Sequence, residues 1–231
     1  MATAIPIENI AIQAISMGAS LAGATPVAPL LASPAQRLFP LNRQVFKVRT
    51  VVVLALEHAE GQPEMDWWDN RAGRTPGNRQ LAKINRRLAN WLQETYSAQT
   101  CDLPYNVGGG GIFLKDAAVL AGLGVVGKNN LLITPQFGPR VRLRASLLNL
   151  PVQSQRALDD FAPCDTCDRP CWQACPQKAF EEGFYSRKRC LGQMQKDETN
   201  PIIGPSPIDG MPITIRIVYC RQCELHCPVG Q

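Results

Sequence analysis

Eight of the nine cysteines lie after residue 163, and their spacing constrains the fold of that region more than any other feature of the sequence. They form two sets that each end in Cys-Pro: Cys164, Cys167, Cys171 and Cys175 before Pro176, and Cys190, Cys220, Cys223 and Cys227 before Pro228. Three closely spaced thiolates can hold one [4Fe–4S] cube, and the fourth cysteine, next to the proline, then ligates the other cube. The pattern therefore predicts two [4Fe–4S] clusters in a ferredoxin-like region.

If the last cysteine of each set ligates the cube of the other set, each cluster has four ligands. One cluster is expected to take Cys164, Cys167, Cys171 and Cys227, and the other Cys175, Cys190, Cys220 and Cys223. The first set separates its second and third cysteines by three residues, where two is usual, so we expect the loop to bulge at Asp168–Pro170.

Two other uses of cysteine compete with this interpretation. Paired Cys-x-x-Cys elements also build zinc sites, although those usually need only four ligands and no terminal Cys-Pro. Disulfides need an oxidising compartment. The apolar segment Ile10–Ala32 does not match an export signal, because no Lys or Arg precedes it and Glu8 and Gln13 interrupt its apolar start. We therefore expect a cytoplasmic protein.

Composition limits the remaining classes of protein. The chain has 231 residues, 45% of them apolar, which is enough for one or two packed domains. Its 24 basic and 19 acidic side chains give a net charge of +5, spread without a long run of like charge, so the balance does not indicate nucleic-acid binding. No uninterrupted run of about 18 apolar residues is present, so we expect no membrane span.

Before the cysteines, predicted strands alternate with predicted helices. Val45–Leu56 is dense in Val and Leu, as in a strand buried on both faces. Leu81–Leu92 carries the apolar stripe of a helix that Asn78 can cap. The other expected elements are a helix over 7–17, strands over 20–25, 101–107 and 130–134, a helix over 112–121 and a strand from Arg140.

This alternation predicts an α/β domain over residues 1–150. A linker at 151–163 and the cysteine-bearing domain follow, the latter occupying 151–231 with the linker included, and for the two domains together we expect the fold class α+β. From Arg140 onward the sequence alternates strictly, which places Arg140, Arg142 and Arg144 on one face; we expect that face to be solvated or to contact a partner.

The glycines between residues 122 and 128 resemble two nucleotide-binding motifs. Gly122–Gly127 matches a dinucleotide fingerprint, and Gly122–Lys128 fits the opening of a P-loop. In both motifs the glycine turn follows a strand and opens a helix, whereas the predicted order here is the reverse. We expect these glycines to let the backbone approach a flat cofactor or a neighbouring strand.

The run from Lys115 to Gly138, followed by the double cysteine set, resembles the epoxyqueuosine reductase family. The resemblance implies a nitroreductase-like, cobalamin-type domain, related to corrinoid reductive dehalogenases, joined to a ferredoxin-like domain with two [4Fe–4S] clusters. It implies a bound corrinoid (cobalamin), with flavin as another option. Carried over residue by residue, it implies that Gly124, Gly127, Lys128, Asn129 and Asn130 lie near the corrinoid.

Three departures from the family pattern concern its activity. The family carries an Asp-Thr-Gly-like segment whose Asp is a proton donor, and here the segment is Val107–Gly111, which holds no acid. The family also carries a Glu after its Gly-Ser-aromatic strand, and Ala145 occupies that position here. The sequence also stops four residues after Cys227, without the helical-repeat extension that members often use on tRNA.

Three hypotheses follow for the function. The first is an iron–sulfur oxidoreductase that delivers low-potential electrons to a bound corrinoid, with a redox partner protein or reductant, a small-molecule substrate and no tRNA. The second is a ferredoxin-like electron carrier for a partner enzyme, without an organic cofactor. The third is a true epoxyqueuosine reductase acting on tRNA with another proton donor, such as Asp116 or Asp102.

A few further side chains have ordinary structural explanations at this stage. Cys101 is expected to be a small buried side chain in its strand, and His226 to be exposed or to lie behind the ligands. His58 follows the buried strand and could cap its end or meet a cofactor. Trp67 and Trp68 could cover a planar cofactor or pack on the adjacent helix.

Overall fold

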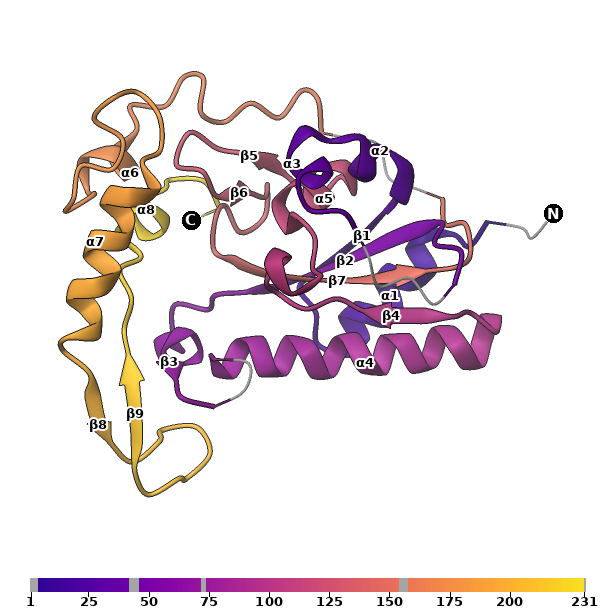
Figure 1. Cartoon of the computed structure of the whole chain (residues 1–231), viewed down its shortest axis with the longest axis horizontal. Helices are drawn as coiled ribbons and strands as arrows, with labels where there is room; N and C mark the ends of the chain where they lie inside the picture. The colour runs from indigo at the N-terminus through magenta and orange to yellow at the C-terminus, as the bar shows by residue number, and fades with distance from the viewer. Residues whose placement is uncertain (1–3, 42–45, 72–73, 154–157, 231) are drawn as a thin grey trace. The chain divides into compact units, whose positions relative to one another are not determined.

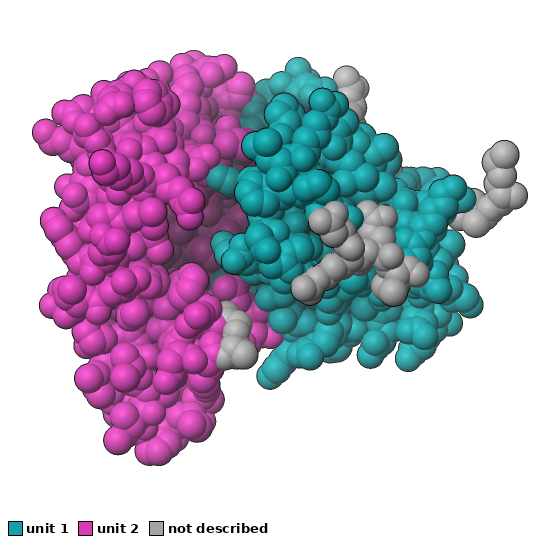
Figure 2. Space-filling view, in the orientation of Figure 1, with its two compact units in different colours: residues 1–57, 81–125, 142–161 teal, residues 58–80, 126–141, 162–231 magenta. Residues whose placement is uncertain are grey.

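The computed structural model describes residues 4–41, 46–71, 74–153 and 158–230. The chain divides into two compact units, shown in different colours in Figure 2. The first unit comprises residues 1–57, 81–125 and 142–161, and the second comprises 58–80, 126–141 and 162–231. The whole cysteine-bearing segment therefore falls in the second unit, together with two segments from earlier in the sequence. The single boundary at residue 150 stays a prediction.

Within the described residues, the first unit contains a four-stranded sheet in the order β1-β2-β7-β4 (Figure 1). Its strands are β1 (Leu21–Pro26), β2 (Thr50–Glu57), β7 (Val141–Leu148) and β4 (Thr100–Asp102). β1 pairs antiparallel with β2, and β4 pairs antiparallel with β7. All of β2 except its last residue is buried, which confirms the expected strand buried on both faces. Val45, where we expected that strand to begin, lies outside the described residues.

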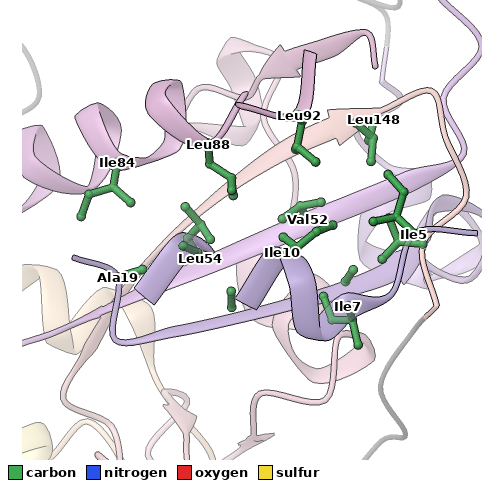
Figure 3. Packing of buried hydrophobic residues seen from close by; sticks show 14 of the residues in the cluster. Ile5, Ile7, Ile10, Ala19, Val52, Leu54, Ile84, Leu88, Leu92 and Leu148 are labelled. Atoms are coloured by element: carbon green, nitrogen blue, oxygen red, sulfur yellow. The ribbon is translucent and has the colours of Figure 1, made fainter. Parts of the chain in front are cut away.

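Helices cover both faces of this sheet. On one face, Ile10 of α1 (Ile7–Ser16) and the stripe of α4 (Pro76–Tyr96) pack on Val52 and Leu54 of β2 (Figure 3). On the other, α2 (Val27–Ala32) and α5 (Leu114–Leu120) lie against β1, and α5 also contacts β2. The short helix α3 (Pro34–Arg37) follows α2. The predicted apolar stripe of α4 therefore matches a buried face.

The start of α4 differs from the expected one. The helix begins at Pro76, so Asn78 lies inside it and does not cap it. Instead, the hydroxyl of Thr75 accepts a hydrogen bond from the backbone N–H of Asn78 at 3.1 Å. A threonine before a proline at the first helical position is a common helix start, since proline lacks the N–H that would be left unpaired there.

The second unit is built from short elements. β3 (Trp68–Asp69), β9 (Thr214–Ile217) and β8 (Ile202–Gly204) form a three-stranded sheet in that order. The cysteines lie on or beside the short helices α6 (Pro170–Gln173) and α8 (Gln222–Leu225) and on α7 (Arg187–Glu198). β5 (Val125–Val126) pairs with β6 (Leu132–Ile133), and two 3-10 turns, η1 (Pro63–Asp66) and η2 (Val107–Gly109), complete the described elements.

The expected solvated arginine face is wrong. Arg140 and Arg142 are buried, and Arg144 donates to the carbonyl oxygen of Leu103 at 3.5 Å. The reason is that the fold supplies partners for these side chains, since Arg140, just before β7, donates to the carbonyl oxygens of Cys227 and Val229. In the part of the chain that is described, none of the helices is both long and apolar enough to span a membrane.

Candidate functional site

None of the nine cysteines, all of which the structure describes, forms a disulfide. Eight of them lie in the second unit, and Cys101 lies in β4 of the first, half-buried as a strand residue. Among the described residues, no three His, Cys, Asp or Glu side chains converge closely enough to share one metal ion. The thiols nevertheless influence one another electrostatically, and that influence divides them into two groups.

The first group centres on the buried Cys171. Burial and the negative charges of Cys227, Cys167 and Cys164 raise the pKa of Cys171 to about 11. Burial likewise raises the pKa of Cys227, with Cys164 and Cys167 adding to the shift. These four thiols therefore lie near one another, although Cys227 is distant from the others in sequence.

The second group centres on Cys223. Burial and the charges of Cys190, Cys220, Glu224 and Cys175 raise the pKa of Cys223 to about 12. Burial also raises the pKa of Cys220, and Cys175 and Cys190 contribute to that shift. The electrostatic influences link the same residues that the sequence analysis groups together, and the assignment of ligands to each cluster stays a prediction.

Backbone N–H groups point at several of the sulfur atoms. The N–H of Lys128 lies 3.5 Å from Sγ of Cys164, that of Arg169 lies 3.4 Å from Sγ of Cys167, and that of Ala179 lies 3.3 Å from Sγ of Cys175. Arg169 adopts the left-handed conformation, with φ 56°, immediately before α6. The expected bulge in the three-residue spacer is therefore present, and it directs one N–H to a sulfur.

The loop at residues 127–131 contacts both groups of cysteines. Lys128 Nζ donates to the carbonyl oxygen of Cys164 at 3.3 Å, and Asn129 Nδ2 donates to that of Cys223 at 3.3 Å. Asn129 is buried, and its Oδ1 accepts from the N–H of Leu131. Trp172 Nε1 donates to the carbonyl oxygen of Lys128 at 3.0 Å. The loop thus holds the two cysteine groups to one another.

The other loop residues are placed as follows. A Cβ at Gly127 would lie 2.6 Å from Cγ1 of Ile133, so this glycine permits the close approach of β6, the second of the two roles considered above. Asn130 has φ 60°, a conformation that asparagine tolerates better than most residues. Gly124 lies in the first unit.

A ring of four charged side chains stands beside the second cysteine group, and the sequence analysis did not find it. His58 Nδ1 lies 2.7 Å from Glu224 Oε1, and His58 Nε2 lies 3.5 Å from Asp66 Oδ1. Arg221 closes the ring, because it pairs with Asp66 at 2.6 Å and with Glu224. Despite burial, hydrogen bonds from His58 and Arg221 hold the pKa of Glu224 below its usual value. No local pattern links these residues, which lie up to 166 positions apart.

A cavity of about 740 Å³ opens next to this ring. Its lining includes His58, Asp66, Trp67 and Arg221, together with Tyr219 and Cys220. Trp68 packs edge-on against Tyr219, with ring centroids 5.2 Å apart, and the guanidinium of Arg216 lies 5.6 Å from the ring of Trp67. Both tryptophans therefore have contacts in the β9 region.

The first unit holds two aspartates that could carry a proton. Asp102 Oδ1 accepts from Asn85 Nδ2 at 2.8 Å and from Ser146 Oγ at 3.3 Å. Desolvation raises the pKa of Asp102 above its ordinary value, and the lowering effect of Ser146 and two arginines does not cancel it. Desolvation also raises the pKa of Asp116, against the charge of Lys115. The four-glycine loop, by contrast, contributes backbone alone.

The chain is similar in sequence to two kinds of known protein. No family model matches the chain. It is 35% identical to the tetrachloroethene reductive dehalogenase of Sulfurospirillum multivorans over 121 residues, 48% of this chain and 22% of that protein. It is 29% identical to the epoxyqueuosine reductase of Gloeobacter violaceus over 186 residues, 78% of this chain and 56% of that one. It is 31% identical to the epoxyqueuosine reductase of a Synechocystis strain over 157 residues, 67% and 51% respectively.

Solved structures share the fold. An epoxyqueuosine reductase with a modified tRNA-Tyr stem loop superposes with a TM-score of 0.67 at 19% identity, over 97% of this chain and 65% of that one. A catabolic reductive dehalogenase superposes with a TM-score of 0.67 at 18% identity, over 97% and 32%. These likenesses define the class: a mixed α/β fold found in two kinds of oxidoreductase.

Within that class, the sequence matches confirm the resemblance to the epoxyqueuosine reductase-like family. The chain spans about half the length of the epoxyqueuosine reductases named above.

Proposed function

We propose that this protein is an iron–sulfur oxidoreductase in which the eight clustered cysteines hold two [4Fe–4S] clusters that serve a bound corrinoid. The observation that carries the proposal is the electrostatic division of the thiols into two groups of four. A cube places each thiolate on its own iron atom, so its ligands need not converge on one point as the ligands of a single zinc ion do.

The donor set fits iron–sulfur chemistry. Cys164, Cys167, Cys171 and Cys227 would hold one cluster, and Cys175, Cys190, Cys220 and Cys223 the other. Thiols with raised pKa values are unfavourable as free thiolates, and bound iron would supply the positive charge that stabilises them. Such clusters accept and donate single electrons, at potentials that depend on burial and on N–H groups aimed at the sulfurs. The N–H groups of Lys128, Arg169 and Ala179 are in place for that tuning.

The corrinoid part of the proposal comes from the family. One reductive dehalogenase of this fold is described as performing B12-dependent dehalogenation, and here the family resemblance implies that Gly124, Gly127, Lys128, Asn129 and Asn130 contact the corrinoid. Nothing in the comparisons supports a flavin. A redox partner protein or a small reductant would supply the electrons, and a small molecule would be the substrate.

A second candidate is the reduction of epoxyqueuosine in tRNA with Asp102 as proton donor. It is favoured by the raised pKa of Asp102 and by the hydrogen bonds from Asn85 and Ser146, which fix one carboxyl oxygen and leave the other for a proton. The four-glycine loop offers no acid for this role. A tRNA assay with Asp102→Asn and Asp116→Asn distinguishes this candidate from the first: activity that only Asp102→Asn abolishes would support it.

Metal and corrinoid analysis of protein purified without oxygen tests the main proposal. We expect about eight irons per chain, four for each cube, an equal amount of acid-labile sulfide, and one cobalt that remains with the protein on gel filtration. Zinc or a single iron centre would contradict the clusters. Eight irons with no corrinoid, even after incubation with cobalamin, would instead favour a plain electron carrier.

A further inference from the structure

We propose that the ring formed by His58, Asp66, Arg221 and Glu224 positions Cys220 and Cys223 for the second cluster and sets that cluster's reduction potential. This inference rests on the proposed function, because it presupposes the two clusters. It assigns His58 and Asp66, far from any of the cluster cysteines in sequence, as positioning residues.

The ring joins two distant segments of the second unit. His58 and Asp66 lie in the segment that begins the unit, whereas Arg221 and Glu224 each directly follow a predicted ligand, Cys220 and Cys223. Arg221 donates to Asp66 Oδ2 at 2.6 Å, and Glu224 lies 2.7 Å from His58 Nδ1. Two contacts therefore fix the short cysteine loop from one side.

The charged side chains of the ring have little contact with water, so they depend on one another. The side chains of Asp66 and Glu224 are 8% and 9% exposed, and that of His58 is 15% exposed. Buried charges are unfavourable unless they are paired, and removing one partner of such a pair typically costs about 3–5 kcal/mol. Because each acid contacts both His58 and Arg221, moving the cysteine loop would break several ion pairs together.

The backbone of His58 is also held in place by a hydrogen bond. Its backbone N–H donates to the carbonyl oxygen of Arg140 at 2.8 Å, and the Arg140 guanidinium donates to the carbonyl oxygen of Cys227 at 3.3 Å. Cys227 belongs to the first cysteine group. The ring therefore ties the loop of the second group to a residue that also holds the first.

The role expected for His58 from the sequence does not explain the ring. His58 does not merely cap the end of β2, because both of its ring nitrogens face carboxylates. Glu224 directly follows Cys223 and is held in place by His58 and Arg221, so its negative charge lies next to a predicted ligand. A charge that acts on a ligand thiol also changes the free energy of adding an electron to a cluster held by it.

Variants at Asp66 test this inference, because Asp66 is remote from every cysteine in sequence. Asp66→Asn keeps a hydrogen-bond acceptor and removes one negative charge, so we expect about eight irons and a more positive potential for the second cluster only. Asp66→Ala removes the carboxylate that joins His58 to Arg221 and leaves the ring open, so we expect iron to fall to about four per chain, with loss of the second cluster's signal. Potentials are measured by redox titration followed by electron paramagnetic resonance.

Controls separate the possible outcomes. Cys190→Ser identifies which resonance belongs to the second cluster. Glu64→Gln makes the same charge change as Asp66→Asn in the same short helix but outside the ring, and should match the unmodified protein. If Asp66→Ala does not fold, the potential of Asp66→Asn decides. If both clusters of Asp66→Asn have the same reduction potentials as in the unmodified protein, the inference is wrong. If the unmodified protein contains no clusters, the proposed function and the inference are both wrong.

Discussion

The guanidinium of Arg140 reaches the carbonyl oxygen of Cys227, with Nη1 at 3.3 Å, and the carbonyl oxygen of Val229, with Nη2 at 2.8 Å. Arg140 is buried, so its charge is offset by these two carbonyl dipoles rather than by water. The chain around the last cysteine therefore depends on an arginine that lies 87 positions earlier.

Arg140→Met should destabilise the second unit. The substitution keeps the volume of the side chain but leaves two carbonyl oxygens without donors, and hydrogen bonds to a charged group are worth about 1.5–3 kcal/mol each. We expect a loss of about 2–4 kcal/mol in urea unfolding and a lower iron content. Arg187→Met, at an exposed arginine of α7, should change neither; equal effects of the two substitutions would contradict the role of Arg140.

Gly138→Ala should also loosen the end of the chain. Gly138 has φ +54°, and a Cβ there would lie 1.9 Å from the carbonyl oxygen of Val229, so the backbone would have to move. The left-handed conformation alone costs a non-glycine residue about 1–2 kcal/mol, and we expect a larger total loss.

Gly192→Ala is the matched comparison for Gly138→Ala. Gly192 lies inside α7 with open space around its Cα. Alanine is favoured over glycine in a helix by about 0.8–1.0 kcal/mol, so this variant should gain stability. Thermal or urea unfolding measures both, and a loss of stability in Gly192→Ala would show that the space is not open.

The carboxyl of Asp102 should give the protein a particular dependence on pH. Desolvation raises the pKa of Asp102 in the folded state, so the folded protein binds this proton more tightly than the unfolded chain does. The contribution of Asp102 to stability is therefore most favourable below the ordinary pKa of an aspartate, about 3.9, and declines as the pH rises through the folded-state pKa.

Asp102→Asn should remove that decline. We expect the variant to gain stability relative to the unmodified protein at neutral pH and to gain less at pH 3, because an asparagine oxygen can still accept from Asn85 and Ser146. Urea unfolding at a series of pH values measures the difference. A difference that stays constant across the series would mean that the pKa of Asp102 is the same in both states.

Single cysteine substitutions separate the clustered thiols from Cys101. Cys171→Ser removes the buried centre of the first group, and we expect iron to fall from about eight to about four per chain. Cys101→Ser lies in β4 of the first unit and should leave the iron content unchanged. Full iron content in Cys171→Ser, measured in protein prepared without oxygen, would exclude this residue as a ligand.

Several features of the fold could be predicted because their signals are local. The buried strand β2 is marked by its continuous run of Val and Leu, and the core stripe of α4 by its helical period. The bulge before Pro170 follows from one additional residue between two cysteines. The start of α4 was missed because a threonine and a proline outside the predicted helix, rather than Asn78, begin it.

The sequence by itself determined the number of thiols, their spacing in two sets, and the resemblance carried by the Lys115–Gly138 run. Spacing along the chain was sufficient to predict two clusters, because each set contains cysteines that are only two or three residues apart. The tertiary structure decided which charges are buried and which are paired. Arg140 and His58 acquire their roles from partners 87 and 166 positions away, since hydrogen bonds and ion pairs across such separations form only when the fold brings the segments together.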